Sequence, residues 1–82
     1  MVEVIYDKKF QKIFSKIKDN LFKEKVKKQI QKIVADPQVG KPMMYTRKGT
    51  RELYVAPFRL AYAYHQNEDC IEFLDIYHKD EQ

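Results

Sequence analysis

The sequence predicts an α+β domain with the element order β-α-α-β-β-β, in which a helical hairpin packs on a mainly antiparallel four-stranded sheet. Two observations lead to this fold class. In the first half of the chain, apolar residues recur at helical spacing in two successive stretches. In the second half, three short runs rich in aromatic and β-branched residues alternate apolar and polar positions, as strands with one buried face do. The 82 residues are the length of one domain, so residues 1–82 form a single predicted unit.

The N-terminal half is expected to hold one strand and both helices. Val2 to Tyr6 alternates as a short strand, and Asp7 is a suitable N-cap for a helix from Lys8 to Lys18. A second helix follows the break at Asp19-Asn20 and ends at Asp36-Pro37. The apolar stripes of the two helices are Phe10, Ile13, Phe14 and Ile17, and then Phe22, Val26, Ile30, Ile33 and Val34. With about two residues between them, the helices should form an antiparallel hairpin, and residues 36–50 should form one long loop.

The three runs RELYVAP, FRLAYAYH and CIEFLDIYHK are predicted to form an antiparallel meander. Their register is ambiguous, because a slip of one residue moves every side chain to the other face. A two-residue turn at Asn67-Glu68 would place Arg59 opposite Ile76. We predict instead an odd loop around Asn67, which places Arg59 opposite Tyr77. This register puts Leu74 and Ile76 in the core, and Asp75 and Phe73 on the open face.

The matched periods of helices and strands also predict the core. The helical stripes should pack on the meander face that carries Leu53, Val55, Leu60 and Tyr62.

Charge is distributed unevenly along the chain. Residues 1–50 hold 13 Lys and Arg against 5 Asp and Glu, whereas residues 51–82 hold 3 against 7. A basic helical half suits an acidic partner such as RNA, the ribosome or an acidic peptide. The single cysteine, Cys70, excludes an intramolecular disulfide and a cysteine-based zinc site. With no signal pattern and no apolar run of membrane length, we expect a soluble cytoplasmic domain without a membrane partner.

The best functional lead is the basic and aromatic cluster expected around Arg59. Small Ala61 and Ala63 flank this arginine on its face, and a guanidinium binds phosphate with two parallel hydrogen bonds. The last run ends in Tyr77, His78 and Lys79, and the meander returns this triplet to the start of the middle strand. An imidazole that exchanges protons near neutral pH suits general acid–base catalysis. Glu52 is a further candidate base, although pairing with Arg51 or Arg59 is the simpler interpretation.

RNA cleavage fits this set because it needs no metal. A base removes the 2′-hydroxyl proton, cations stabilise the charge at phosphorus, and an acid protonates the departing 5′-oxygen. The products are a 2′,3′-cyclic phosphate and a 5′-hydroxyl end. The sequence has no His-x-x-x-His, no Asp-x-Asp and no carboxylate cluster at ligand spacing. We therefore predict neither a metal site nor a cofactor.

The chain resembles the RelE/ParE superfamily of small toxins over nearly its whole length. The resemblance rests on the element order, the GKP loop after the second helix, FRLAYAY, and a last strand ending in YHK. It implies that the chain is the toxin of a type II toxin–antitoxin module. The RelE-like members of this superfamily cut messenger RNA in the translating ribosome and are held inactive by an antitoxin. By position the resemblance implies catalytic roles for Arg59, Tyr77, His78 and Lys79. Two positions that are basic in many active members are Glu52 and Tyr54 here, and the chain stops at Gln82 before a terminal tyrosine that some members use.

The predicted function is accordingly a metal-independent, ribosome-dependent mRNA endoribonuclease that inhibits translation. Its expected partners are the ribosome with its mRNA and a short, acidic, helical antitoxin. Further residues expected to bind RNA are Arg47, Lys48, Arg51 and Tyr54. Two alternatives stay open: a ParE-like toxin that poisons another target such as DNA gyrase, and a binding module that keeps the fold without efficient catalysis.

Overall fold

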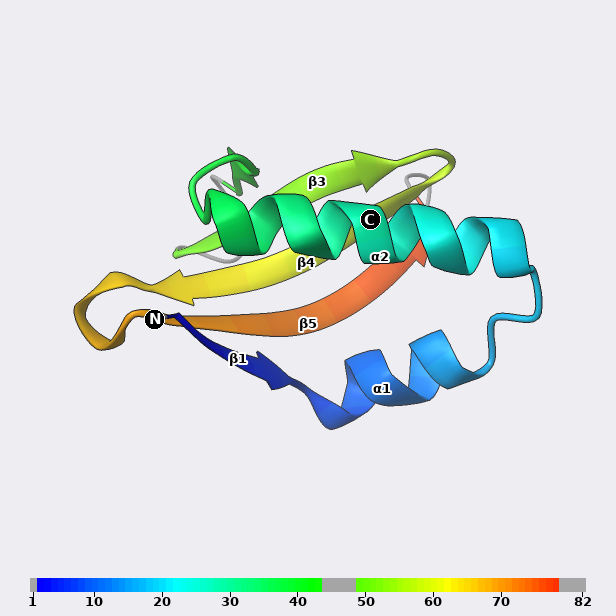
Figure 1. The fold of residues 1–82 in the computed structure, drawn as a ribbon, viewed down its shortest axis with the longest axis horizontal. Helices are drawn as coiled ribbons and strands as arrows, with labels where there is room; N and C mark the ends of the chain where they lie inside the picture. The colour runs from blue at the N-terminus through cyan, green and yellow to red at the C-terminus, as the bar shows by residue number, and fades with distance from the viewer. Residues whose placement is uncertain (1, 44–48, 79–82) are drawn as a thin grey trace.

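The computed structural model describes residues 2–43 and 49–78. Two helices lie on one face of a five-stranded sheet whose strand order is β1-β5-β4-β3-β2 (Figure 1). The first and last strands pair in parallel, and the other neighbours are antiparallel. The elements are β1 (Glu3–Tyr6), α1 (Lys8–Ser15), α2 (Asn20–Ala35), β2 (Lys41–Pro42), β3 (Thr50–Val55), β4 (Phe58–His65), a 3₁₀ turn (Gln66–Glu68) and β5 (Cys70–His78). The predicted α+β fold is confirmed, with one more strand than expected.

The helices begin where the sequence placed their caps. Asp7 Oδ1 accepts a hydrogen bond from the Lys9 amide at 2.9 Å, and Asp19 Oδ1 accepts one from the Leu21 amide at 2.9 Å. These carboxylates satisfy amides that have no partner within the first turn of a helix. The first helix stops at Ser15, so the connection to α2 is longer than predicted. Among the described residues, no helix is both long and apolar enough to cross a membrane.

The additional strand, β2, lies inside the segment that was predicted to be a loop. Lys41 pairs with Glu52 and Pro42 with Arg51 at the edge of the sheet. Two residues are too few to show an alternation of apolar and polar side chains, and proline lacks the amide that a strand ladder uses. A strand this short therefore leaves no pattern in the sequence.

The core lies between the helices and the sheet, as the two apolar periods predicted. Its fully buried side chains include Val26 and Ile33 from α2 and Leu60 and Tyr62 from β4, and Phe10 of α1 is 2% exposed. Phe14, Ile17, Ile30 and Leu53 are partly buried and pack against this cluster. Cys70 is also buried, and burial raises the pKa of its thiol.

A β-bulge in β5 corrects the predicted register. Arg59 lies opposite Tyr77 as predicted, but the ladder shifts by one residue between Ala61 and Tyr62, so that Tyr62 lies opposite Phe73. The connection is the four residues Gln66 to Asp69 rather than an odd loop, and the bulge supplies the extra residue.

The bulge decides which face two side chains take. Phe73 is fully buried in the core, so its predicted place on the open face is wrong. Leu74, predicted in the core, is the extra residue of the bulge and is not part of the core cluster. Ile76 is in the core as predicted. Asp75 lies on the other face opposite Ala61, but it is only 7% exposed and pairs with Lys9 at 3.1 Å.

Tyr62 ties the segment before β2 to the core. Its ring is fully buried, and its hydroxyl donates to the Pro37 carbonyl at 2.7 Å and accepts from the Gly40 amide at 2.9 Å. On the same face, Arg51 Nη1 donates to the carbonyls of Gln38 and Gly40, at 3.1 and 2.7 Å. These four bonds fix residues 37–40 against β3 and β4.

The outer edge of β1 is partly closed by a side chain. The amides of Glu3 and Asp7 donate to the carbonyls of Asp69 and Phe73, on the side of β5. The residues that alternate with Glu3 and Asp7 therefore direct their backbone groups to the open edge of the sheet. One of these, the Tyr6 carbonyl, accepts a hydrogen bond from the Gln11 side chain at 2.7 Å.

Gly40→Ala should destabilise the fold by about 1–3 kcal/mol, because a Cβ there would lie 2.5 Å from the Tyr62 hydroxyl oxygen. Urea denaturation would measure the loss. The ring carbons Cε1 and Cζ of Tyr62 would also lie 2.7 and 2.9 Å from that Cβ, so in a Tyr62→Leu background, where the ring and its oxygen are gone, the same change should cost clearly less. Equal costs in the two backgrounds would contradict the close contact.

Alkaline pH should weaken the fold through Tyr62. Burial raises the pKa of this phenol above its ordinary value of about 10. The folded state therefore holds the proton more tightly than the unfolded chain, and this contribution is present below about pH 10 and is lost as pH rises towards the folded pKa. The unfolded phenol ionises between about pH 8 and pH 11. Over this range the wild type should lose more thermal stability than Tyr62→Phe. Parallel curves would contradict the assignment.

Candidate functional site

The sheet face turned away from the helices carries three rows of side chains, which the strand register places side by side. The first row is Tyr54, Arg59 and Tyr77, the second is Glu52, Ala61 and Asp75, and the third is Thr50, Ala63 and Glu72. We call this the outer face. Each row takes one residue from β3, one from β4 and one from β5, so residues far apart in sequence meet on one surface.

Glu52 is the centre of the polar cluster on this face. Its Oε1 accepts a hydrogen bond from Arg59 Nη1 at 2.8 Å, and its Oε2 accepts one from the Tyr77 hydroxyl at 2.6 Å. The side chains of Arg59 and Glu52 are 31% and 15% exposed, so the ion pair is partly shielded from water. One carboxylate therefore joins a cation from β4 and a phenol from β5, and we call these three residues the Glu52 cluster.

The small residue Ala61 makes this arrangement possible. Glu52 is on β3 and Tyr77 is on β5, so their hydrogen bond spans β4, on which Ala61 lies opposite Glu52. A methyl group leaves the space above β4 open to the longer side chains, and Ala61 is completely buried.

Tyr54 gives the cluster an exposed aromatic neighbour. It lies directly opposite Arg59 and is 51% exposed. A phenol ring in that position can stack on a base or on another planar group.

His78 does not join the cluster. It lies opposite Phe58 at the end of β5, and the two rings meet edge to face with centroids 5.4 Å apart. Phe58 in turn packs on Phe22 of α2. Since Tyr77 is on the outer face, the next residue in the strand is on the helix face.

The other predicted site residues are not part of the cluster. Arg51 is on the helix face of β3, where its Nη1 is bonded to the backbone carbonyls of residues 38 and 40. Arg47, Lys48 and Lys79 lie outside the described residues. Of the residues predicted to be catalytic, the structure brings together Arg59 and Tyr77.

The link that Glu52 makes between these two residues was not predicted from the sequence. An ion pair between Glu52 and Arg59 was one of the predicted pairings, and it is confirmed. The signal for the second bond was the set Glu52, Ala61 and Tyr77, but a carboxylate and a phenol two strands apart meet only if the strand between them carries a small residue. In the described segments, no three His, Cys, Asp or Glu side chains are placed to hold a metal ion.

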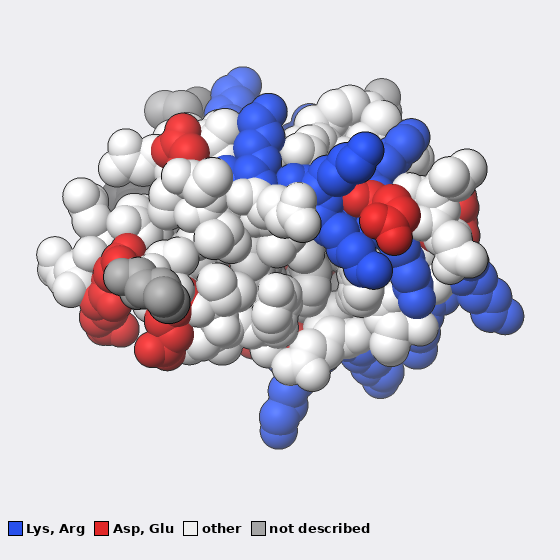
Figure 2. Space-filling view, in the orientation of Figure 1, with Lys and Arg blue, Asp and Glu red and all other residues white. Residues whose placement is uncertain are grey.

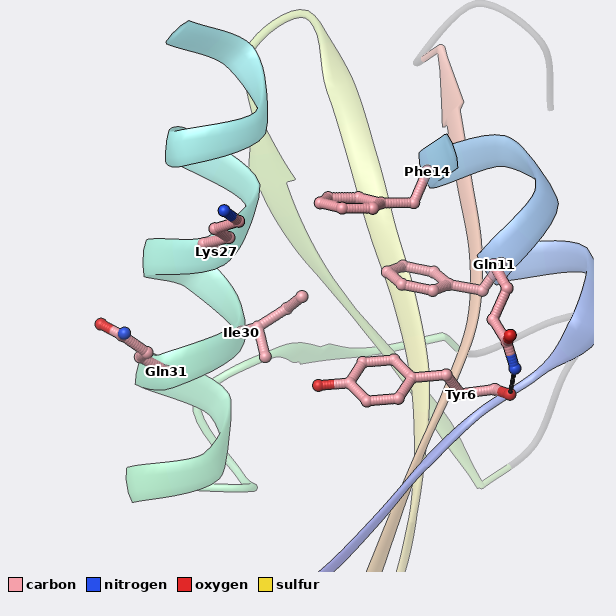
Figure 3. Close-up of a pocket in the computed structure, with 7 residues that line it drawn as sticks. Tyr6, Gln11, Phe14, Lys27, Ile30 and Gln31 are labelled. Atoms are coloured by element: carbon pink, nitrogen blue, oxygen red, sulfur yellow. Dashed lines mark hydrogen bonds between the residues drawn. The ribbon is translucent and has the colours of Figure 1, made fainter. Parts of the chain in front are cut away.

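A groove also runs between the two helices (Figure 3). Its volume is about 530 Å³, and Tyr6 and Phe14 point across it towards Ile30 of α2. Its polar lining consists of the Tyr6 hydroxyl and the side chains of Gln11, Gln31 and Lys27, and Lys27 lies 3.7 Å from Glu24. Neutral amides and a paired lysine give this groove little charge with which to select a ligand.

Charge is separated over the surface. Lysines gather at the end of the molecule where α2 begins, and carboxylates gather near the connection between β4 and β5 (Figure 2). On the face that Figure 2 shows, basic and acidic side chains therefore gather at opposite ends of the molecule, although Asp19 and Glu24 lie among the lysines where α2 begins.

Comparisons with known proteins identify the family and the fold. A family model described as "ParE toxin of type II toxin-antitoxin system, parDE" matches residues 4–82. A search of curated proteins found no significant match.

Solved structures give the same fold. The isolated RelE toxin of E. coli is 12% identical with a TM-score of 0.81, over 100% of this chain and 88% of that one. The toxin–antitoxin complexes RelBE of E. coli and RelBE2 of Mycobacterium tuberculosis both give a TM-score of 0.79. The identities are 14% and 19%, over 95% of this chain and 96% and 98% of those chains.

Glu52 and Arg59 should be energetically coupled. In a double-mutant cycle with Glu52→Gln and Arg59→Met, the coupling should be roughly 1 kcal/mol, because a partly shielded charge-assisted hydrogen bond is worth more than an exposed ion pair. Chemical denaturation at low salt would measure it. The exposed pair His65 and Glu72, at 3.4 Å, is the matched control and should show less coupling. Additive effects at Glu52 and Arg59 would contradict the pairing.

Proposed function

Because the chain belongs to the ParE toxin family of type II toxin–antitoxin systems, we propose that it is a toxin that cuts messenger RNA on the ribosome. The observation that carries this proposal is the Glu52 carboxylate, which accepts hydrogen bonds from Arg59 and Tyr77. A base, a cation and a hydroxyl donor thus meet in one cluster, and these are the groups that metal-free RNA cleavage requires.

Arg59 has the electrostatic role in this proposal. Its guanidinium would bind the non-bridging oxygens of the scissile phosphate, whose negative charge grows as the 2′-oxygen attacks phosphorus. Contacts that strengthen as this charge develops lower the barrier. The phosphate would compete with Glu52 for the same guanidinium.

Glu52 and Tyr77 would move the proton. Glu52 takes the proton of the 2′-hydroxyl as the 2′-oxygen bonds to phosphorus, and the Tyr77 hydroxyl gives its proton to the 5′-oxygen as the P–O5′ bond breaks. The proton on Glu52 then returns to Tyr77 along the existing 2.6 Å hydrogen bond. The cluster regains its starting state, and the products are a 2′,3′-cyclic phosphate and a 5′-hydroxyl.

Tyr54 would position the substrate. Exposed beside Arg59, its ring can stack on a base next to the scissile phosphate. Arg47 and Lys48 are proposed to contact the RNA backbone. The role of Arg51 would be indirect, since it holds residues 38 and 40 in place.

His78 and Lys79 have supporting roles in the proposal. His78 is on the helix face beside Phe58, so the proton transfer assigned above does not need it. Lys79 would add positive charge near the RNA.

The proposed partners are the translating ribosome with its mRNA and a cognate antitoxin. Two of the solved proteins that share this fold, from E. coli and M. tuberculosis, are toxin–antitoxin complexes. The proposed antitoxin is a short, acidic and helical protein that holds the toxin inactive in the cytoplasm.

A second candidate function is a ParE-like toxin that poisons another target, such as DNA gyrase, without cutting RNA. Two observations favour it. The matching family model is that of a ParE toxin, and the charge of Arg59 is already balanced by Glu52.

The test is to add purified variants to translating ribosomes and map the 5′ ends of the mRNA. Arg59→Ala should slow cleavage by about 10²–10³-fold, because one charge-stabilising contact is lost. Glu52→Gln and Tyr77→Phe should slow it as well, and His78→Gln should leave most of the rate. His65→Gln, on the same strand as Arg59 but at its other end, is the matched control.

Two results would contradict the proposal. Unchanged cleavage by Arg59→Ala and Glu52→Gln would exclude the Glu52 cluster as the site. Growth arrest with intact mRNA, together with inhibited DNA supercoiling, would show that the second candidate is correct.

A further inference from the structure

A second hollow lies at the end of the molecule on the helix side of the sheet. The Glu52 cluster is on the other face, although Phe58 of this hollow is next to Arg59 in β4. The hollow forms where the connection between α1 and α2 meets the turn between β3 and β4, and its volume is about 710 Å³. Its apolar lining includes Ile17, Phe22, Pro57 and Phe58. We call it the end pocket.

Leu21 stands at the end pocket and is 77% exposed, the most exposed of the large apolar residues described. The helix start fixes its position, because the Leu21 amide is bonded to the Asp19 carboxylate. The fold thus holds a large aliphatic side chain in water beside an apolar hollow, at a site where a polar residue would serve the helix equally well. Exposed apolar surface with a polar rim is typical of a site for another protein.

The rim of the end pocket is positively charged. Lys18, Lys25 and Lys28 line it, and none of them forms an ion pair with a carboxylate of residues 2–43 or 49–78. Two carboxylates also line the pocket, but both are engaged. Asp19 accepts the amides that begin α2, and Glu24 lies 3.7 Å from Lys27.

We propose that the end pocket is a docking surface for an acidic segment of the antitoxin that carries an apolar side chain. Leu21 and the pocket floor would bury that side chain, and the three lysines would pair with carboxylates around it. Charges of opposite sign around an apolar centre are the usual arrangement of a specific protein interface. The inference rests on the antitoxin partnership proposed above, but not on cleavage of RNA.

The packing of the aromatic rings in the pocket favours a peptide over RNA. The aromatic ring at its floor, Phe58, is already packed between Phe22, at 5.0 Å, and His78, at 5.4 Å. It is therefore not open for a base to stack on, which is how proteins hold single-stranded RNA. An RNA contact would use the lysines and would gain little from Leu21.

The experiment measures the affinity of the full-length toxin for the protein encoded by the adjacent reading frame. Leu21→Asp should weaken binding by roughly tenfold to a hundredfold, since it removes the central apolar contact and adds a charge that repels an acidic segment. It should not impair folding, because Asp is favourable in the first turn of a helix. Lys25→Glu with Lys28→Glu should weaken binding by a similar factor, and the loss should shrink at high salt.

The controls separate this pocket from the rest of the surface. Ile5→Glu changes an exposed apolar residue of β1, and Lys32→Glu changes a lysine in the last turn of α2. Both should leave the affinity within about twofold, as substitutions outside an interface do. A second arm titrates poly(U) RNA against the toxin and follows the backbone amides of residues 17–28 by NMR.

Each contrary outcome overturns the inference. If Leu21→Asp binds as tightly as the wild type, the antitoxin docks elsewhere. If the adjacent protein does not bind the wild type, the occupant is wrong. If poly(U) shifts the amides of residues 17–28 and the adjacent protein does not, the end pocket is an RNA surface. Loss of RNA cleavage alone, with this binding pattern intact, would overturn the ribonuclease proposal and leave this one standing.

Discussion

The pairing of β4 with β5 is the constraint on which both faces of the sheet depend. Next to the 3₁₀ turn, the register places Tyr62 opposite Phe73 and brings both rings into the core. Beyond the bulge, the register has moved by one residue and places Arg59 opposite Tyr77 on the outer face. Without the extra residue in β5, one of these two sets would be on the wrong side of the sheet. The bulge therefore lets one strand serve the core and the Glu52 cluster at once.

The Glu52 cluster also changes what Arg59 can do. An arginine among small neighbours would offer its full charge to any anion, whereas Arg59 is paired with a carboxylate 2.8 Å away and is less than one third exposed. A phosphate gains from Arg59 only what exceeds the ion pair that it displaces. That competition favours ligands that also engage Tyr54 or Tyr77, and it disfavours anions that bring charge alone.

Much of the fold could be predicted from the sequence because its signals are local. Caps at Asp7 and Asp19, apolar stripes and strand alternation each depend on neighbouring residues, and the structure confirms them. The bulge could not be predicted, because Phe73 and Leu74 are both apolar and either suits a core. For the site, Arg59 and Tyr77 followed from the expected pairing. The role of Glu52 depends on a contact across three strands, which no local pattern reveals. The face of His78 follows from strand alternation once Arg59 is paired with Tyr77.

The two edge strands of the sheet are short, and this limits association of the protein through its strands. A free edge is a template on which another chain can add a strand, and proteins shorten or block such edges to stay apart. Here one edge is formed by the two-residue β2, whose Pro42 has no amide to donate, and beyond it by the end of β3, where the Gln29 side chain donates to the Tyr54 carbonyl. The other is the four-residue β1, where Gln11 already occupies the Tyr6 carbonyl. Within residues 2–43 and 49–78, neither edge offers an incoming strand a long, open ladder, and this disfavours the stacking of copies of this chain into larger sheets. Recognition of another molecule is left mainly to side chains.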